Sequence, residues 1–445
     1  MAMNVERSTC VDLYKFADVF SLDNVRKACL RWMTRHFTEV ASSEEFCGLS
    51  LNQLTEIISH DELDVKEETT VWEAVVRWVQ HSREDRLHHL PSILPHIRYS
   101  LLTSDDTAAI LEHPLVREDP GSSEVIKNVV HRGASNIKPR FGIGAEEMAL
   151  FIQARSNRMQ GINPRLGKYF SCSLAEIPPI VSATVTSDNE IYVLTAKSKD
   201  QLFLLLYNQM KGVWEQKSVV ERLPGSLCHQ YLLAVDGHLY YFCCNWTNPS
   251  QIITLKKYDR NTIEWQDCSQ LKTNISYMEP AVSNGCLYLL SSTELHCYSP
   301  KEDRWFKRAP LTDSTDMFWT SIALGTEIFH SDLDFTSVSV YDTDANRWQK
   351  LPAGKSALEA EDRKYRANLF VLENQLHVYL NTQEPDYRQV LVFDRCEGVW
   401  REMDVTLPDN LVWICSPVVA RVYLPGVLGR CANTQRTADA GDRAV

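Results

Sequence analysis

Two kinds of hydrophobic periodicity divide the chain. Up to about residue 116, apolar residues recur every three to four positions, which is the period of an amphipathic helix. From about residue 147, short apolar runs alternate with tight polar turns, as in strands joined by hairpins. The pattern therefore predicts an all-α part followed by an all-β part, with a polar, turn-rich stretch between them.

The clearest predicted helix spans residues 65–80, because apolar residues recur at helical spacing from Val71 to Val79. Glu67 and Glu68 fall in its first turn, where the helix dipole favours negative charge. Further helices are predicted over 11–19, from an N-cap at Ser21, from Ser42, over 51–59 behind an N-cap at Ser50, and over 104–112. Short connections between them indicate antiparallel pairs stacked in a helical array.

One hairpin recurs through the second part of the chain: an aromatic residue, a short polar turn, and a tryptophan seven positions on. The copies are Tyr207…Trp214, Tyr258…Trp265, Tyr298…Trp305, Tyr341…Trp348, Phe393…Trp400 and a weaker one at Ile162…Tyr169. They repeat every 40–52 residues, which is typical of radial β-repeats. Four strands per copy and six copies predict a six-bladed β-propeller whose blades pack through these aromatics.

Tight turns support the same repeat. Asp236-Gly237 and Asn284-Gly285 are two-residue hairpin signals, because a type I′ turn needs positive φ at both positions. The first copy begins at its second strand, Met148–Gln153, so its innermost strand is expected within Val412–Tyr423. Such a strand would close the ring.

Many positions of the helical part resemble the BACK domain in type and order. They are Phe46, Leu49-Ser50, Ile57-Ile58-Ser59, Asp61-Glu62-Leu63, Val65, Val71-Trp72, Trp78-Val79, His81, Arg86, Leu94, Ile97-Arg98 and Leu101-Leu102. With the β-repeats, the chain resembles the BTB–BACK–Kelch family, the Kelch-repeat-and-BTB-domain group. The resemblance implies an all-α BACK helical array followed by an all-β six-bladed Kelch β-propeller.

Domain boundaries follow from the change of pattern. We expect a BACK domain at 1–116, whose first helix pair resembles the 3-box, and a linker at 117–146 with room for a last BACK helix over Val125–His131. The propeller is expected at 147–424, closed by a C-terminal strand, and a disordered tail at 425–445.

The chain departs from the family pattern in two respects. By the resemblance, we expect the BTB domain, which in the family dimerises and binds the cullin-3 scaffold, to be missing before the first BACK helix pair. The Gly-Gly doublet of Kelch repeats is also missing, and Cys243-Cys244, Ser291-Ser292 and His330-Ser331 stand near its place. The fold must therefore accommodate side chains at these positions, where the family has glycine.

Composition narrows the class of partner and the compartment. The 445 residues carry a formal net charge of −12, which argues against a nucleic-acid binder. No run of 18 apolar residues and no secretory signal is found, so no membrane association is expected. Thirteen cysteines without such a signal favour free thiols in a reducing compartment, the cytoplasm or the nucleus.

No motif in the sequence indicates catalysis. Gly354-Lys355-Ser356 imitates the end of a P-loop, but Gln349 stands where the motif requires its first glycine. His88, His89 and His96 have no cysteine or carboxylate at metal-ligand spacing. We therefore expect no catalytic residue, metal or cofactor, with a propeller enzyme kept as a third hypothesis.

The longer loops lie on one face of the predicted ring, which is where a protein partner would bind. They carry both aromatic and acidic residues, and the acidic ones are Asp313, Asp316, Asp332, Asp334, Glu361, Asp362, Glu384 and Asp386. The candidate partner-binding residues are Trp246, Tyr277, Trp319, Tyr365, Arg366 and Tyr387, because aromatics and arginine dominate binding hot spots. Trp319 and Tyr365 could instead plug the central channel, and the acidic residues could form a solvated rim.

The resemblance implies a substrate-recognition adaptor of a cullin-3 RING E3 ubiquitin ligase, which binds a protein degron on the Kelch loop face. Without the BTB domain, cullin-3 binding is expected to be weakened. The alternative is an interaction scaffold outside the ubiquitin pathway, such as a cytoskeletal Kelch protein. The BACK segment favours the adaptor.

Overall fold

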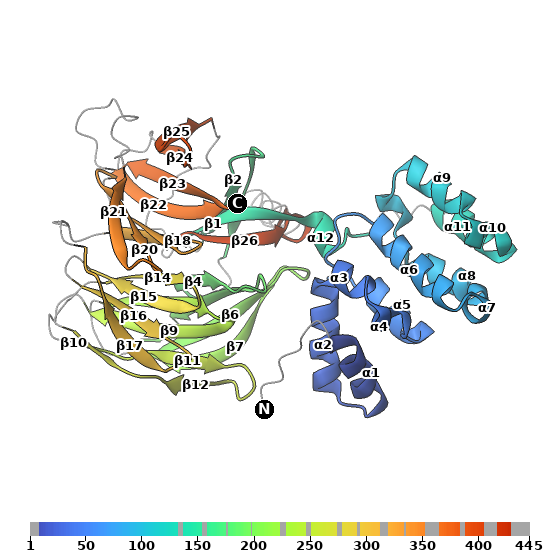
Figure 1. Cartoon of the computed structure of the whole chain (residues 1–445), viewed down its shortest axis with the longest axis horizontal. Helices are drawn as coiled ribbons and strands as arrows, with labels where there is room; N and C mark the ends of the chain where they lie inside the picture. The colour runs from blue at the N-terminus through green and yellow to red at the C-terminus, as the bar shows by residue number, and fades with distance from the viewer. Residues whose placement is uncertain are drawn as a thin grey trace, which may run out of the picture. The chain divides into compact units, whose positions relative to one another are not determined.

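The chain forms two compact units in the computed structural model: Met1–Ala145 with Tyr423–Pro425, and Glu146–Val422 with Gly426–Val445. The described residues are 9–131, 137–153, 158–174, 177–196, 198–222, 228–245, 251–273, 278–291, 294–311, 319–332, 335–351, 365–382, 388–404 and 416–428. The first unit is helical and the second is a six-bladed β-propeller (Figure 1). Both parts of the predicted fold class are confirmed.

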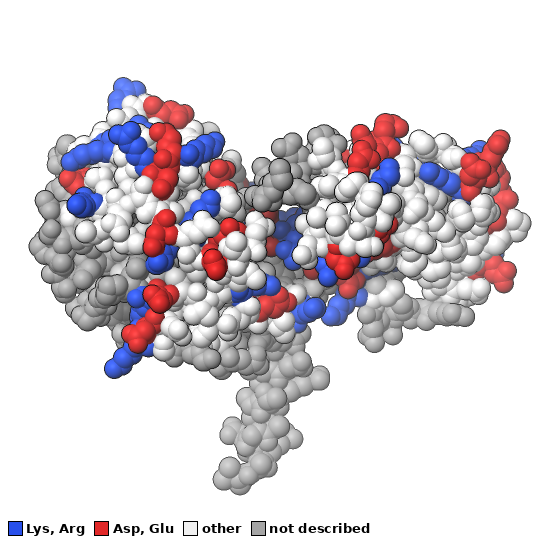
Figure 2. All heavy atoms as spheres, turned by 90° about the horizontal axis from the view of Figure 1, so that it is seen from below, with Lys and Arg blue, Asp and Glu red and all other residues white. Residues whose placement is uncertain are grey.

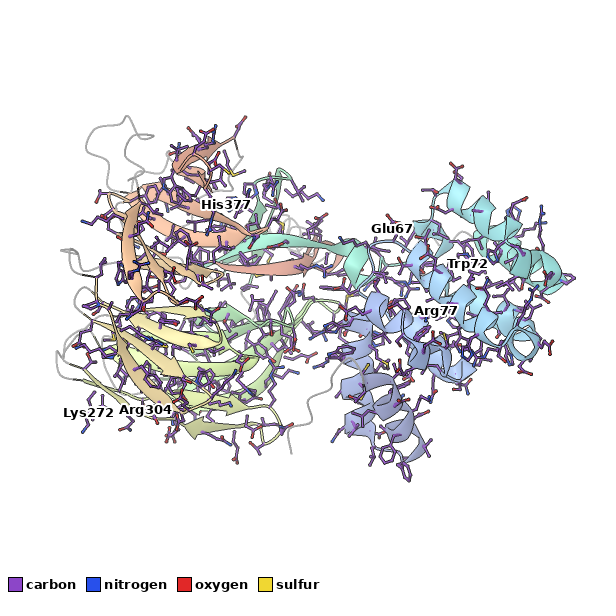
Figure 3. The ribbon with its side chains drawn as sticks, viewed as in Figure 1. Glu67, Trp72, Arg77, Lys272, Arg304 and His377 are labelled. Atoms are coloured by element: carbon purple, nitrogen blue, oxygen red, sulfur yellow. The ribbon has the colours of Figure 1, made fainter. Side chains whose placement is uncertain are left out.

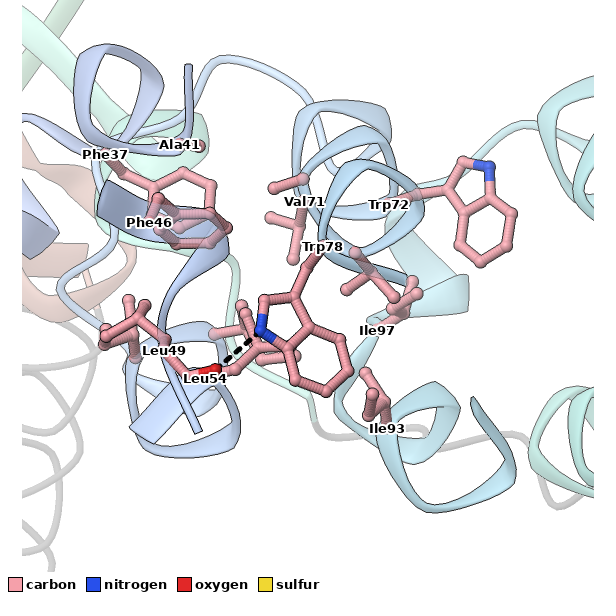
Figure 4. Close-up of a cluster of buried hydrophobic side chains, with 14 of the residues drawn as sticks. Phe37, Ala41, Phe46, Leu49, Leu54, Val71, Trp72, Trp78, Ile93 and Ile97 are labelled. Carbon is pink, nitrogen blue, oxygen red and sulfur yellow. Dashed lines mark hydrogen bonds between the residues drawn. The ribbon is translucent and has the colours of Figure 1, made fainter. Parts of the chain in front are cut away.

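The helical unit is built from short amphipathic helices. They are α1 Cys10–Val19, α2 Asp23–Arg35, α3 Phe37–Ala41, α4 Glu44–Cys47, α5 Leu51–Ser59, α6 Thr69–His81, α7 Arg83–Arg86, α8 Leu90–Ile93, α9 Ser104–Glu112, α10 Pro114–Glu118, α11 Pro120–His131 and α12 Phe141–Gly144. Trp78 of α6 lies at the centre of the core, and its indole Nε1–H donates to Leu49 O at 2.8 Å (Figure 4). A buried indole thus gains packing area without leaving its donor unpaired.

Helix starts follow the predicted caps in one case and not in another. The Ser50 hydroxyl accepts from Gln53 N while the Gln53 side chain accepts from Ser50 N, a complete capping box. The predicted N-cap at Ser21 is wrong, because Leu22 occupies that position. Ser21 has a φ of +54°, and its N–H donates to Asp18 O, so it belongs to the end of α1.

The stretch predicted as a linker contains more helix than expected. The helix expected there was placed over Val125–His131, yet α11 begins at Pro120. Proline is favoured at the first position of a helix, where its missing N–H costs nothing. The Asp119 carboxylate accepts from Ser122 N at 2.9 Å, which caps the helix, and Ile126 is buried.

Six four-stranded antiparallel sheets form the blades of the propeller. Blade 1 consists of β26 Val418–Tyr423, β1 Ala145–Gln153, β2 Arg158–Asn163 and β3 Lys168–Ser173. Blade 2 consists of β4 Ile180–Val185, β5 Ile191–Ala196, β6 Gln201–Asn208 and β7 Val213–Glu221. Blade 3 consists of β8 Cys228–Val235, β9 His238–Asn245, β11 Lys256–Asp259 and β12 Glu264–Asp267. Blade 4 consists of β14 Glu279–Ser283, β15 Cys286–Leu290, β16 Leu295–Ser299 and β17 Arg304–Arg308. Blade 5 consists of β18 Trp319–Leu324, β19 Glu327–Asp332, β20 Val338–Asp342 and β21 Arg347–Leu351. Blade 6 consists of β22 Tyr365–Leu372, β23 Gln375–Thr382, β24 Arg388–Asp394 and β25 Val399–Met403. A short ribbon pairs β10 Gln251–Ile253 with β13 Leu271–Thr273.

Blade 1 joins the two ends of the propeller segment, since its innermost strand is β26. Asn189, in the β4–β5 turn of blade 2, fastens that strand. Its side-chain amide donates to Arg421 O at 2.7 Å, and its side-chain oxygen accepts from Arg421 N at 2.7 Å. Residues 424–428 then form a helical turn in which Val427 is buried, so the start of the predicted tail is ordered by apolar burial. Residues 429–445 lie outside the described residues.

The recurrent aromatic pairs occupy equivalent places in the blades. Tyr258 is the cross-strand partner of Trp265, and their ring centroids are 5.2 Å apart. The weaker copy has the same register, because Ile162 pairs with Tyr169. In blade 4 the Trp305 Nε1–H donates to Ser269 O at 2.8 Å, in the segment that leads from blade 3. The aromatics are therefore structural, as the sequence predicted.

Where the structure describes them, the positions that replace the Gly-Gly doublet are buried rather than open. His330 of β19 is buried, and its Nδ1 lies 2.9 Å from the Ser321 hydroxyl on the neighbouring strand. Its ring meets the edge of Trp348 with centroids 6.2 Å apart. Burial lowers the pKa of His330 from 6.5 to about 4, because the charged imidazolium would lose its hydration.

Replacing His330 by glutamine should flatten the acid side of the stability profile. The unfolded chain binds this proton near the ordinary pKa of about 6.5, whereas the folded chain binds it only near 4. Between these values unfolding takes up one proton, so the free energy of unfolding falls as pH falls, by about 1.4 kcal/mol per pH unit. Urea unfolding at pH 7, 6 and 5 measures the difference between the two proteins. Identical pH slopes would contradict the assignment.

Candidate functional site

The two ends of each blade differ in the length of their connections. In blade 5 a tight turn joins Leu324 to Glu327, which are register partners, and the β20–β21 turn lies at the same end. We call this end the turn face. At the opposite end β18 begins at Trp319 and β19 ends at its partner Asp332. We call the end with Trp319, Asp332 and their equivalents in other blades the loop face.

The structure places three of the six predicted partner-binding residues on the loop face. Trp319 begins β18, and Tyr365 and Arg366 begin β22, both innermost strands. Arg366 is exposed. Trp246, Tyr277 and Tyr387 lie outside the described residues, so their role stays a prediction.

The predicted acidic rim needs a correction at Asp332. This residue is buried, and its carboxylate accepts from Thr336 N at 2.6 Å and from Ser337 N at 3.2 Å. Both donors belong to the connection that follows β19. Asp332 therefore orders its own loop and is not available to a partner. The other acidic residues assigned to the rim lie outside the described residues.

Sequence reasoning missed the residues beside Arg366. In blade 6 its register partner is Asn381, and the partner of Asn381 on the next strand is Arg388. Two guanidinium groups thus flank an amide at the loop face. The alternation of side chains along a strand was the available signal, but it becomes useful only once the register between three strands is known.

The described residues show neither a metal-binding cluster nor a membrane-spanning helix. Within them, no group of three or more His, Cys, Asp and Glu is arranged to hold a metal ion. The helices in this part of the chain are all too short or too polar to cross a membrane. What the loop face offers chemically is hydrogen-bonding and charged groups on a rigid frame.

The helical unit carries a buried ion pair that holds the segment before β1. Glu68 is the N-cap residue of α6, and Arg140 is the N-cap residue of α12. The Arg140 Nε and Nη2 each donate to Glu68 at 2.6 Å, and both side chains are fully buried. Arg140 Nη1 also donates to Ile58 O at 2.7 Å, and Arg98 N donates to Glu68 at 3.0 Å. The predicted first-turn position of Glu67 and Glu68 is wrong, because α6 begins at Thr69, and Glu68 acts chiefly through this pairing.

The first helix pair exposes apolar side chains at its tip. Phe16 of α1 and the C-cap residue Phe20 have ring centroids 4.4 Å apart and are 51% and 60% exposed, and Val19 beside them is 75% exposed. Behind the tip, Arg26 of α2 is held by Glu56 of α5 at 2.7 Å. A clustered apolar tip on a fixed helix pair is typical of an interaction surface.

Comparison with known proteins agrees with both units. The BACK family, described as BTB And C-terminal Kelch, matches residues 10–112. Kelch repeat and BTB domain-containing protein 2 of Homo sapiens is 27% identical, and the alignment covers 91% of this chain and 69% of that protein. Kelch repeat and BTB domain-containing protein 8 of Xenopus tropicalis is 23% identical, over 86% of this chain and 66% of that protein. Kelch-like protein 3 of Mus musculus is 27% identical over 52% of this chain and 34% of that protein.

Proposed function

We propose that this chain, which carries a BACK domain, is a substrate-recognition adaptor of a cullin-3 E3 ubiquitin ligase. The premise is that the chain is a distant homologue of the Kelch-repeat-and-BTB-domain proteins. The loop face captures a protein substrate in the cytoplasm or the nucleus. Catalysis belongs to other subunits. The chain supplies proximity and orientation, which raise the effective concentration of the substrate.

The single observation that carries the proposal is the combination of the two units in one chain. A propeller alone is compatible with many functions, because fold does not determine function. A propeller behind a BACK domain places a rigid recognition face after a helical spacer. The buried pair between Glu68 and Arg140 supports that reading, because it fixes the last residues of the spacer before β1.

The exposed tip at Phe16, Val19 and Phe20 is the proposed contribution of the helical unit to ligase binding. It lies on the helix pair that resembles the 3-box. The residues matched to relatives include no BTB region. We therefore expect the 445-residue chain by itself to capture cullin-3 weakly in a pull-down. Full-strength capture by this chain alone would contradict that part of the proposal.

The alternative is a scaffold that acts outside the ubiquitin pathway, such as a cytoskeletal Kelch protein. It uses the same loop face and makes no use of the BACK domain as a ligase spacer. It predicts co-sedimentation with actin and no change in ubiquitin attachment when the protein is removed. The BACK match over residues 10–112 favours the adaptor.

Proximity labelling in cells tests the binding face. The triple variant Trp319→Ala, Tyr365→Ala, Arg366→Ala should lose one dominant labelled partner, because the three residues begin two innermost strands of the loop face. The control is Arg347→Ala, an exposed arginine at the turn-face end of β21. An unchanged partner list for the triple variant would contradict the proposal, as would the same loss in the control.

A further inference from the structure

The turn between the third and fourth strands carries the same side-chain cap in five of the six blades. Six positions before the Trp position of the repeat stands an asparagine or aspartate, whose side-chain oxygen accepts from backbone N–H groups two or three residues on. In blade 6, Asp394 Oδ1 accepts from Cys396 N at 2.9 Å and from Glu397 N at 3.2 Å. The capping residues are Asn163, Asn208, Asp259, Asp342 and Asp394.

Blade 4 departs from this pattern, because it has Ser299 in the capping position and Pro300 directly after it. Serine forms such side-chain turns more weakly than aspartate or asparagine. Within the described part of the chain, the Ser299 hydroxyl makes no hydrogen bond, and neither do the backbone N–H groups of Lys301 and Glu302. The blade 4 turn therefore lacks the cap that the other five turns have.

Two cationic side chains flank Ser299. Arg304 of β17 (Figure 3) is its register partner, and Lys301 lies in the turn between them. Both are exposed, and neither forms an ion pair with another described residue. Cross-strand partners have Cβ atoms about 5 Å apart, so the Arg304 guanidinium can reach an acceptor attached to the Ser299 oxygen.

The two acidic residues of the same turn compete little with an added anion. The Asp303 carboxylate already accepts from Tyr298 OH at 2.7 Å and from Ser269 N at 2.8 Å. Glu302 is exposed, so solvent and salt screen its charge. The chain has a formal net charge of −12, and acidic and basic side chains are intermixed on the face shown in Figure 2. An anion on Ser299 therefore gains from its immediate neighbours and not from the overall charge.

We propose that Ser299 is a phosphorylation site for a proline-directed serine/threonine kinase, and that the phosphate caps the blade 4 turn. A proline directly after the acceptor serine is the element that such kinases recognise. Ser299 is half-buried and Lys301–Arg304 are exposed, so local opening of the hairpin presents the serine. The Ser299 Oγ attacks the γ-phosphorus of ATP, the bond to ADP breaks, and the hydroxyl proton passes to the catalytic base of the kinase.

The phosphate supplies what the other turns obtain from aspartate or asparagine. It carries a charge of about −2 and three acceptor oxygens, which can accept from the turn amides and pair with Arg304 and Lys301. We expect the phosphorylated chain to unfold at a thermal midpoint about 2 °C higher than the unmodified chain, as one added surface cap would give.

A second Ser-Pro dipeptide provides an internal comparison. Ser416-Pro417 is the other place in the chain where serine or threonine precedes proline. Pro417 is buried, and β26 begins at the next residue. A kinase cannot grip this proline without detaching the strand that closes the ring. Ser416 is therefore expected to stay unmodified in the folded chain.

Incubation of the full folded chain with ATP and an active proline-directed kinase tests the proposal. Peptide mass spectrometry locates the phosphate, and a synthetic peptide of residues 294–308 serves as the unfolded reference. We expect the modified peptide from the folded chain to contain Ser299. Ser299→Ala and Pro300→Ala should each abolish this modification, the second with the hydroxyl still present. Ser416→Ala is the matched control and should leave it unchanged.

Phosphate in the synthetic peptide but not at Ser299 of the folded chain would overturn the site, because the fold would then conceal the serine. Phosphate that persists at Ser299 in Pro300→Ala would overturn the assignment to a proline-directed kinase. Thermal midpoints that are equal, or lower after phosphorylation, would overturn the capping role. These measurements involve neither cullin-3 nor a loop-face partner, so their failure would leave the proposed function standing.

Discussion

Glu68→Gln should lower the free energy of unfolding of the helical unit by about 3–5 kcal/mol. The change leaves the Arg140 guanidinium fully buried and without a counter-charge. Arg140 keeps its bonds to backbone carbonyls such as Ile58 O, but those neutral acceptors do not offset the cost of burying a cation. Hydrogen exchange of the α6 amides measures the effect in the intact chain.

The neighbouring Glu67→Gln is the matched control (Figure 3). Glu67 is exposed, and its carboxylate accepts from the Thr69 hydroxyl at 3.3 Å. Removing an exposed charge should change stability by no more than about 0.5 kcal/mol. Exchange rates in α6 that rise equally in both variants would show that Glu68 acts only through the helix dipole.

Asn189→Ala should destabilise the propeller by about 2–3 kcal/mol, with the largest loss of protection in β26. The substitution removes the acceptor of Arg421 N and the donor to Arg421 O, each at 2.7 Å. It also places alanine, whose side chain cannot make a local hydrogen bond, at a φ of +59°. Because β26 closes the ring, its detachment would leave the neighbouring strand β1 of blade 1 as an unpaired edge strand.

Asn374→Ala separates the backbone strain at positive φ from the loss of the two hydrogen bonds to Arg421. Asn374 occupies the corresponding turn of blade 6 with the same φ of +59°, and it is exposed. Its replacement should cost only the backbone strain, about 1 kcal/mol. Urea unfolding of both variants, with hydrogen exchange at Arg421, measures the difference. Equal destabilisation would mean that Asn189 contributes nothing to ring closure.

Features that repeat within short stretches were predictable from the sequence. Tyr258 and Trp265 belong to one hairpin, so their spacing alone determines the register. Asp236 and Gly237 both adopt positive φ, at +48° and +75°, as a type I′ turn requires. Local signals of this kind, repeated six times, were sufficient for the architecture.

Features that join distant residues were not predictable. Glu68 and Arg140 are 72 positions apart, and a glutamate near a helix start has an adequate local explanation without a partner. His377 of β23 (Figure 3) likewise looks like an ordinary strand residue, yet it is completely buried and stacks on Phe370. Burial of polar groups depends on which blade covers which, and a single sequence does not contain that information.

The binding face was predictable in part for the same reason. Arg366 could be named because it follows a long loop, and long loops gather on one face. Arg158 and Arg388 begin β2 and β24, and only the strand register within blades 1 and 6 places them at the loop-face ends of those blades. The aromatic candidates Trp319 and Tyr365 lie on the predicted face by their backbone positions, and the triple variant tests their part in binding.

Ubiquitin attachment to the partner captured by the loop face tests the central claim most directly. The protein is removed from cells, and the ubiquitinated fraction of that partner is measured before and after re-expression of the natural protein or of its triple variant Trp319→Ala, Tyr365→Ala, Arg366→Ala. The adaptor account predicts that the fraction falls on removal, recovers with the natural protein and does not recover with the variant. A ubiquitinated fraction that is unchanged throughout would contradict the adaptor function and favour the alternative, a scaffold outside the ubiquitin pathway.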